Sequence, residues 1–280
     1  MFDVRTDNLL ENISKRNGHS FLCYYNENRT NQIVEPMISV VVPVFKEEKI
    51  LANTLSVYTP ELRKKYNFEL IVSDGGSKDN TLNIAKEYAD TIVTHNLQRK
   101  QTISEGRNNG AAIARGKTIV FINGDTVPEN PDLFFDYIYR WTSKNNEINK
   151  SAALACKVNV IPEEEIFRDK IFYTFHNLYV RILNFIGLGM GRGECQIVNS
   201  DVFKKIGGYN TKIVAGEDFD LYRRISKLYK VEYINKLKVF ESPRRFRKYG
   251  YLRILMSWTL NSLSVWFCGR SVSDNWEAVR

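Results

Sequence analysis

Short, β-branched apolar segments alternate with segments of helical periodicity from Met37 onward. The first, Ile38–Pro43, is closed by a proline and precedes apolar residues at helical spacing between Ile50 and Leu62. The alternation then predicts strands at Phe68–Ser73, Thr91–Thr94 and Thr118–Asn123, and helices at Thr81–Tyr88, Thr102–Arg115 and Asp132–Ser143. Continuous apolar strands between amphipathic helices are typical of a parallel sheet covered on both faces. We therefore expect an α/β fold.

The pattern is less regular on both sides of this region. Residues 1–36 are polar and end at Pro36, which predicts a loosely attached extension or a short helix such as Asn8–Lys15. Beyond residue 150 we expect the same sheet to continue, with a strand at Ala152–Val160, an aromatic-rich segment at Ile166–Leu188, helices near Asp201–Ile206 and Asp218–Leu228, and strands near Val231–Ile234 and Lys238–Phe240. This divides the chain into an N-terminal extension (1–36), two halves (37–150 and 151–248) and an amphipathic C-terminal segment (249–280).

Polar loops follow three of the predicted strands, at Pro43–Glu48, Asp74–Asp79 and Asn123–Thr126. Ligands of such sheets bind beyond the carboxyl ends of the strands, so these loops should converge on one crevice. Asp74 and Asp125 each stand beside glycine, which permits a tight turn and leaves room for a cation and a diphosphate. Ordinary turn capping is the alternative role for both carboxylates.

Composition narrows the class of protein. The chain has 280 residues, of which 43% are hydrophobic and 26% charged, so disordered and low-complexity classes are excluded. The net charge of +8 is compatible with nucleic acid, anionic lipid or phosphate-bearing ligands. Four widely spaced cysteines, Cys23, Cys156, Cys195 and Cys268, argue for reduced thiols and against a zinc site. The N-terminus lacks the pattern of a secretory signal, so we expect a cytoplasmic protein.

Several common catalytic motifs are missing from the sequence. It contains neither G-x-x-x-x-G-K-[ST] nor a G-x-G-x-x-G after the first strand, and it lacks G-x-S-x-G and H-E-x-x-H. Only His19, His95 and His176 are available, so a serine or zinc hydrolase has little to work with. The remaining chemistry rests on the carboxylates at the strand ends.

Five ordered segments of the chain resemble family 2 glycosyltransferases of the GT-A fold. They are Ile38–Glu47, Asp74–Thr81, Arg107–Gly116, Asn123–Asp125, and Gly207–Tyr209 leading to Glu217–Leu221. The resemblance implies a Rossmann-like, mostly parallel sheet flanked by helices. It also implies an inverting transfer of a sugar from a nucleoside-diphosphate-sugar to an acceptor. The Gln-x-x-Arg-Trp motif of processive synthases is not found, so we expect a non-processive enzyme.

The same resemblance assigns roles to individual residues. Residues 37–150 would bind the donor and residues 151–248 the acceptor. Asp218, in the pair with Glu217, would be the general base, and Asp125 would coordinate Mn²⁺ or Mg²⁺. The expected donor-binding residues are Pro43, Val44, Phe45, Glu47, Asp74, Lys100, Arg107, Asn123 and Gly124, while Gly193, Arg244 and Arg245 would meet the acceptor or the diphosphate.

Two positions depart from the family pattern. Asn123 stands where an acidic residue is usual, which removes one negative charge from the metal motif, and Lys46 stands where asparagine is common. The first departure keeps open an alternative, a non-catalytic protein that binds nucleotide sugar or polyprenyl phosphate. A nucleotidyltransferase would need a basic, glycine-rich loop after the first strand, and Pro43–Glu47 is not one.

The pattern of the C-terminal segment predicts a helix that lies against a membrane or against protein. Tyr249–Phe267 is apolar except for Arg253, Ser257, Asn261 and Ser264, and the basic stretch Pro243–Lys248 precedes it. This pattern fits an interfacial helix on an anionic membrane, although packing against the domain or a partner chain would give the same periodicity. Ile171–Leu188 is a second such segment. We therefore expect a peripheral protein on the inner face of the membrane, a sugar or lipid-linked acceptor, and no nucleic-acid partner.

Overall fold

The computed structural model describes residues 9–16, 19–26, 35–95, 99, 101–144, 151–273 and 279. Of residues 9–16 and 19–21 it describes the backbone alone. The strands are β1 (Leu9–Arg16), β2 (His19–Asn26), β3 (Ile38–Val44), β4 (Phe68–Asp74), β5 (Thr91–Thr94), β6 (Thr118–Ile122), β7 (Thr126–Pro128), β8 (Ala153–Val160), β9 (Cys195–Asn199) and β10 (Val231–Glu241). The helices are α2 (Leu51–Ser56), α3 (Pro60–Tyr66), α4 (Thr81–Tyr88), α5 (Ile103–Ile113), α6 (Pro131–Lys144), α7 (Phe167–Phe185), α8 (Ser200–Lys205), α9 (Glu217–Ser226), α10 (Arg244–Tyr249) and α11 (Tyr251–Cys268).

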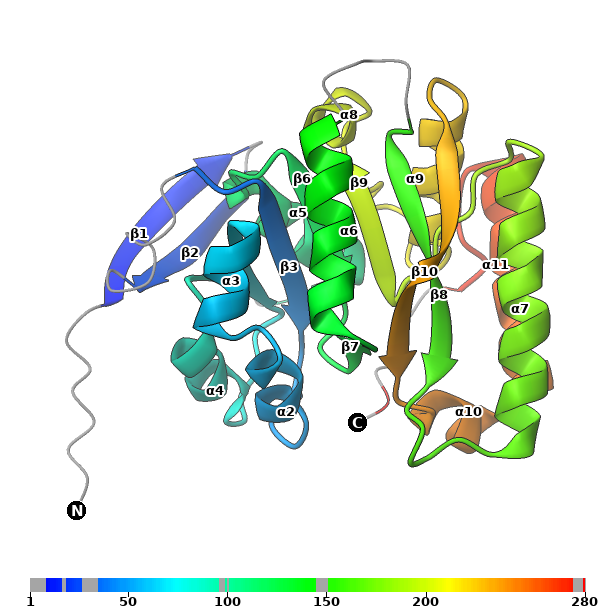
Figure 1. The fold of residues 1–280 in the computed structure, drawn as a ribbon, viewed down its shortest axis with the longest axis horizontal. Helices are drawn as coiled ribbons and strands as arrows, with labels where there is room; N and C mark the ends of the chain where they lie inside the picture. Colours follow the sequence, from blue (N-terminus) through cyan, green and yellow to red (C-terminus); the bar gives the residue numbers. More distant parts are fainter. Residues whose placement is uncertain are drawn as a thin grey trace.

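The strands form one ten-stranded sheet in the order β1-β2-β5-β4-β3-β6-β9-β8-β10-β7 (Figure 1). Its centre, β5-β4-β3-β6, is parallel, as predicted. On either side the pairing changes, because β2 and β9 are antiparallel to their central neighbours while β8 and β10 are again parallel to each other. The predicted α/β fold is confirmed.

Two apolar clusters, one on each face, hold the sheet between its helices. Every residue of β3 and β4 is buried, which explains why these strands read as continuous apolar runs. On one face Phe135 of α6 stacks on Phe68 with 4.2 Å between ring centroids. On the other face α5 packs directly on β3 and β4. The carboxyl ends of these central strands are therefore held in fixed positions.

Three predicted elements differ from the structure. The segment Asn8–Lys15 is not a helix, because Leu9–Arg16 pairs along its length with β2. The run from Ile50 to Leu62 is two helices, since α3 begins anew at Pro60 with Thr59 as its N-cap. The two predicted strands after Val231 are one strand, β10, whose register against β8 shifts between Ile234 and Lys238.

Helices α7 and α11 lie side by side at one edge of the molecule (Figure 1), where Trp258 of α11 stacks on His176 of α7 at 5.3 Å. Both turn polar side chains inward. Asn177 bonds the backbone of Val158, and Asn261 accepts from the backbone N–H groups of Val272 and Ser273. Buried amides of this kind are tolerated because their hydrogen bonds are satisfied.

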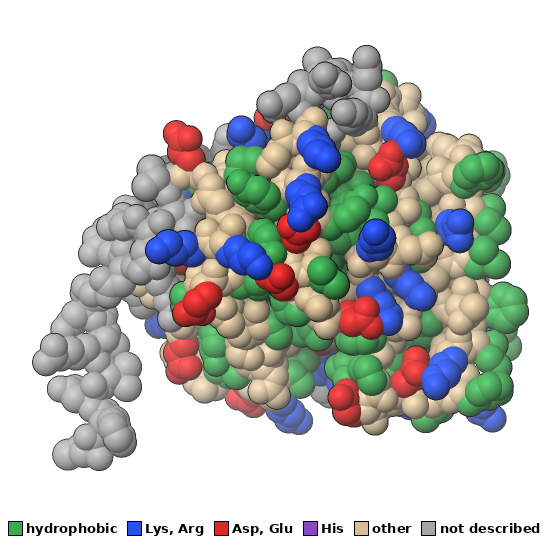
Figure 2. Space-filling view, viewed as in Figure 1, with side chains coloured by type: hydrophobic (Ala, Val, Ile, Leu, Met, Phe, Trp, Pro, Cys, Tyr) green, Lys and Arg blue, Asp and Glu red, His purple; other side chains and the backbone are tan. Residues whose placement is uncertain are grey.

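Many of the exposed side chains of these two helices are apolar. We call the surface that they form the apolar face; its exposed members are Ile171, Phe175, Leu178, Ile182 and Phe185 of α7, and Leu252, Leu255, Met256, Leu260, Leu263 and Phe267 of α11. Figure 2 shows hydrophobic side chains gathered along the edge formed by α7. Neither helix, nor any other in the described part of the chain, is long and apolar enough to cross a bilayer.

Close packing of α5 on the sheet generates a stability prediction. A Cβ atom added at Gly110 would lie 2.4 Å from Cγ1 of Val41, so Gly110→Ala forces α5 away from β3. We expect a loss of about 1–3 kcal/mol of unfolding free energy, measured by urea denaturation. Gly106→Ala in the same helix is the matched control. Its Cβ would lie 3.1 Å from the end of the Gln101 side chain and at an ordinary 3.8 Å from Cβ of Pro43, so equal losses in both variants would contradict the argument.

Candidate active site

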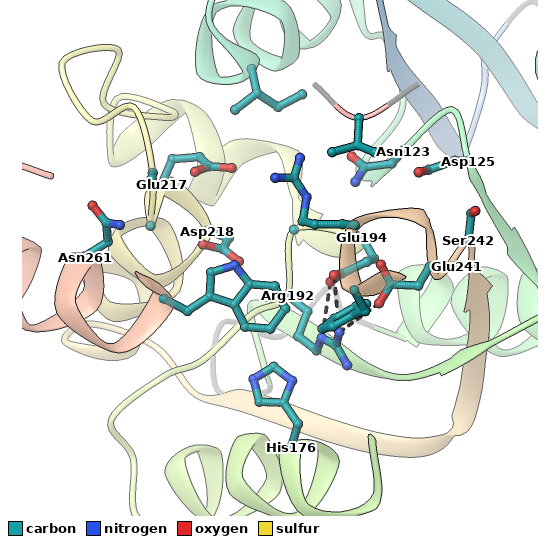
Figure 3. Close-up of a pocket in the computed structure, with 18 of the residues that line it drawn as sticks. Asn123, Asp125, His176, Arg192, Glu194, Glu217, Asp218, Glu241, Ser242 and Asn261 are labelled. Carbon is teal, nitrogen blue, oxygen red and sulfur yellow. Dashed lines mark hydrogen bonds and ion pairs between the residues drawn. The ribbon is translucent and has the colours of Figure 1, made fainter. Parts of the chain in front are cut away.

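A pocket lies beyond the carboxyl ends of the central strands, where α7, α9, α10 and α11 surround it (Figure 3). Most of the residues predicted from the sequence line it. They are Pro43, Glu47, Arg107, Asn123, Gly124, Asp125, Gly193, Glu217, Asp218, Arg244 and Arg245. Figure 3 shows Asn123 and Asp125 on one side of the pocket and Glu217 and Asp218 on another. The structure thus brings together side chains from both halves of the chain.

Backbone hydrogen bonds tie the strand-end loops to one another. The N–H of Gly75 donates to the carbonyl oxygen of Val44 at 2.8 Å, which joins the loops after β3 and β4. The N–H of Asn123 donates to the carbonyl oxygen of Glu194 at 3.1 Å, which joins the loop after β6 to the second half. Two of the three loops predicted to converge, those after β3 and β6, line the pocket, whereas Asp74–Asp79 is bonded to the β3 loop and does not line it.

Some predicted residues lie outside the pocket lining. Asp74 is buried, and its carboxylate accepts from the N–H groups of Gly76 and Ser77 at 3.0 Å, which is the turn-capping role. Val44 and Phe45 pack beneath the loop, where Val44 approaches Gly124 and Phe45 approaches Gly75. Lys100 lies outside the described residues. The assignment of Asp74 and Phe45 to donor binding stays a prediction.

Arg107 is fully enclosed and joins three parts of the pocket. Its Nη1 donates to Glu217 at 2.8 Å, and its Nη2 donates to the side-chain oxygen of Asn123 at 3.1 Å and to the carbonyl oxygen of Gly193 at 2.6 Å. Only 1% of Arg107 is exposed, and both of its terminal nitrogens bond protein groups, so Arg107 positions the pocket walls. Its assignment to donor binding stays a prediction.

Glu217 and Asp218 open helix α9. The turn before them needs Gly216, whose φ is +87°, and this conformation directs the first turn of the helix at the pocket. Burial, and next the negative charge of Glu217, raise the pKa of Asp218 to about 7, although the N–H of Phe219 and the charge of Arg107 oppose the shift. A carboxyl group with this pKa exchanges protons near neutral pH, as a general base must.

An ionic cluster that the sequence did not reveal forms the floor of the pocket. Arg192 pairs with Glu194 at 3.2 Å and with Glu241 at 3.1 Å (Figure 3). His176 lies beside it, and burial together with the charge of Arg192 lowers its pKa to about 3, so the imidazole is neutral. The only sequence signal for this cluster was its position beside the glycine run and the aromatic-rich segment.

Asp125 is paired with a cation from α10. Arg244 Nη2 donates to Asp125 Oδ2 at 3.0 Å and to Glu47 Oε2 at 3.3 Å, and the oxygen of Asn123 is already engaged by Arg107. Within the described residues, no group of three or more His, Cys, Asp or Glu side chains is arranged to hold a metal ion. A Mn²⁺ or Mg²⁺ ion at Asp125 would have to displace the Arg244 guanidinium from this carboxylate, and the ion stays a prediction.

Solved structures share the fold. The mannosyltransferase PcManGT from Pyrobaculum calidifontis, in complex with GDP-Man and Mn²⁺, superposes with a TM-score of 0.58 at 18% identity, covering 75% of this chain and 58% of that one. TarS 1–349 of S. aureus in complex with UDP-GlcNAc gives 0.53 at 16% identity, covering 73% and 58%. These neighbours are GT-A glycosyltransferases, so the predicted GT-A fold is confirmed.

Curated relatives are similar over parts of the chain. Glycosyltransferase AglE of Haloferax volcanii is 29% identical over 96 residues, which are 33% of this chain and 32% of that protein. The dolichyl-phosphate beta-glucosyltransferase of Homo sapiens is 28% identical over 159 residues, 50% of this chain and 48% of that protein. The chain thus matches between a third and a half of the length of these relatives. The model of glycosyl transferase family 2 matches residues 39–179, about half of the chain, and the chain belongs to that family.

Proposed function

We propose that this protein transfers a sugar from a nucleoside-diphosphate-sugar to an acceptor hydroxyl, with inversion at the anomeric carbon. The observation that carries the proposal is Asp218, whose pKa of about 7 suits a base, at the junction of the two halves of the pocket. Family membership and the shared fold support the same reaction. A protein that only binds sugar nucleotide would have no use for such a base.

The proposed step needs one proton acceptor and one leaving group. Asp218 takes the proton of the acceptor hydroxyl while the hydroxyl oxygen forms the new bond to the anomeric carbon. The bond from that carbon to the diphosphate oxygen breaks, and the electron pair leaves with the nucleoside diphosphate. Glu217 and Arg107 hold Asp218 in place through the 2.8 Å ion pair that they form. The donor lies toward Glu47, Asn123 and Asp125, on the opposite wall.

We further propose that the apolar face rests on a membrane and that the acceptor is lipid-linked. Leu255 of the apolar face and Tyr179 of α7, which are 42% and 49% exposed, also line the pocket, so the pocket opens toward that face. The dolichyl-phosphate beta-glucosyltransferase that is similar over half of this chain has a lipid phosphate in its name. The predicted position on the inner, cytoplasmic side stays a prediction.

Replacing Asp218 by Asn tests the base. We expect transfer to fall by about 10²–10⁴-fold, because the amide cannot take a proton, while donor binding is kept. Transfer is followed with radiolabelled UDP-glucose, UDP-GlcNAc and GDP-mannose and polyprenyl phosphate in vesicles, and donor binding by the shift in unfolding temperature. Retained turnover would eliminate Asp218 as the base, and loss of donor binding would indicate a structural defect.

The pH dependence gives a second test of the same residue. The base form of Asp218 exists above its pKa, so kcat should rise with pH and reach half of its maximum near pH 7. In Glu217→Gln the neighbouring negative charge is lost and Arg107 is left uncompensated; both changes lower the pKa of Asp218. The acid limb of the kcat profile should then move to lower pH, and an unmoved limb would refute this assignment.

Membrane contact is tested by flotation with vesicles that contain phosphatidylglycerol. Phe185 and Phe267 are 89% and 79% exposed on the apolar face, and the double variant Phe185→Ser, Phe267→Ser should bind at least about tenfold more weakly. Leu133→Ser with Leu228→Ser is the matched control, because these side chains are 64% and 65% exposed outside the apolar face. Equal loss in both variants, or none, would count against the proposal.

A further inference from the structure

We propose that the guanidinium of Arg244 neutralises the donor diphosphate, in the position where a divalent cation is predicted. This inference rests on the proposed transferase function. It concerns one residue of α10, and its starting point is the contact between Arg244 and Asp125, which lie 119 positions apart in the sequence. A sugar-nucleotide diphosphate needs a nearby cation as its leaving oxygen gains charge.

Arg244 already pairs with two carboxylates of the donor wall. One nitrogen, Nη2, reaches both Asp125 at 3.0 Å and Glu47 at 3.3 Å. The side chain of Glu47 is only 5% exposed, so its negative charge has little access to water and depends on a protein cation. The carboxylates raise the pKa of Arg244, although burial opposes them, and the guanidinium stays charged.

The same side chain keeps hydrogen-bonding capacity for a ligand. A guanidinium has five N–H donors in a planar fork that matches the oxygens of a phosphate. Both carboxylate contacts of Arg244 use Nη2, and Nε is enclosed by protein, so a diphosphate would bond to the terminal nitrogens. Arg244 and the neighbouring Asp125 both line the pocket, 23% and 26% exposed, so an incoming diphosphate can reach them.

A divalent cation would meet two obstacles at this place. The first position of the metal motif is the neutral Asn123, and its oxygen accepts from Arg107. The second position, Asp125, has Arg244 at hydrogen-bond distance, so a metal ion there would face a positive charge or have to displace it. Retention of the guanidinium satisfies both carboxylates and keeps N–H donors at the donor wall without either cost.

The test measures nucleotide binding with and without metal. The full-length chain is unfolded thermally with UDP, GDP, UDP-GlcNAc or GDP-mannose, each with MnCl₂ or with EDTA. We expect one nucleoside diphosphate to stabilise the wild-type protein in EDTA, and Mn²⁺ to change its Kd by less than about threefold. Arg244→Gln should weaken diphosphate binding in EDTA at least about tenfold while leaving binding of the corresponding nucleoside unchanged.

Two further variants separate this role from a loss of structure. Arg253→Gln removes the same charge from an exposed position of α11 outside the pocket lining, and it should bind as the wild type does. Arg244→Lys keeps the charge without the planar fork, so it should retain part of the affinity even if Arg244→Gln unfolds.

The outcomes distinguish the two proposals. Binding in the wild type that requires Mn²⁺, or undiminished diphosphate binding by Arg244→Gln in EDTA, overturns the role of Arg244 and leaves the transferase function standing. Absence of a shift with every nucleotide and sugar nucleotide, with metal and without, overturns the transferase function and this inference with it.

Discussion

A single buried guanidinium joins the two halves of the pocket. Arg107 rises from α5 between the donor wall and helix α9, and it bonds Asn123, Gly193 and Glu217 at once. A cation so enclosed is stable only with these partners, and removing one partner of a buried pair costs about 3–5 kcal/mol. The position of Asp218, which follows Glu217 in the same helical turn, depends on that pair, and with it the pKa on which the proposed chemistry relies.

Much of the fold could be predicted because its central signals are local. The β-branched runs of β3 and β4 are buried on both faces, and such runs are read directly from the sequence. Two of the errors arose where pairing between strands overrides the local pattern, whereas the new helix start at Pro60 did carry a local signal. The polar segment Leu9–Arg16 becomes a strand through its partner β2, and Val231–Glu241 stays one strand because β8 supports it across an irregular register. The local sequence pattern does not indicate which strands will pair.

The sequence predicted which residues line the site better than it predicted what each of them contacts. The ordered motif segments identified Asn123, Asp125, Glu217 and Asp218, and all four residues line one pocket. Their pairings were not readable, because the contact of Asp125 with Arg244 and the enclosure of Arg107 are properties of the folded chain. The ionic cluster at Arg192 was missed for the same reason, because Glu241 joins it from β10, far away in the sequence.

The apolar face of α7 and α11 has a consequence for how substrates arrive. If the apolar face rests on a bilayer, the pocket mouth at Tyr179 and Leu255 is held at a fixed height above the hydrocarbon. A lipid-anchored acceptor then reaches it by lateral diffusion in two dimensions, and the donor reaches it from the aqueous phase. The frequency of acceptor encounters is set by the number of acceptors per unit of membrane area, and the volume of the surrounding solution has no influence on it.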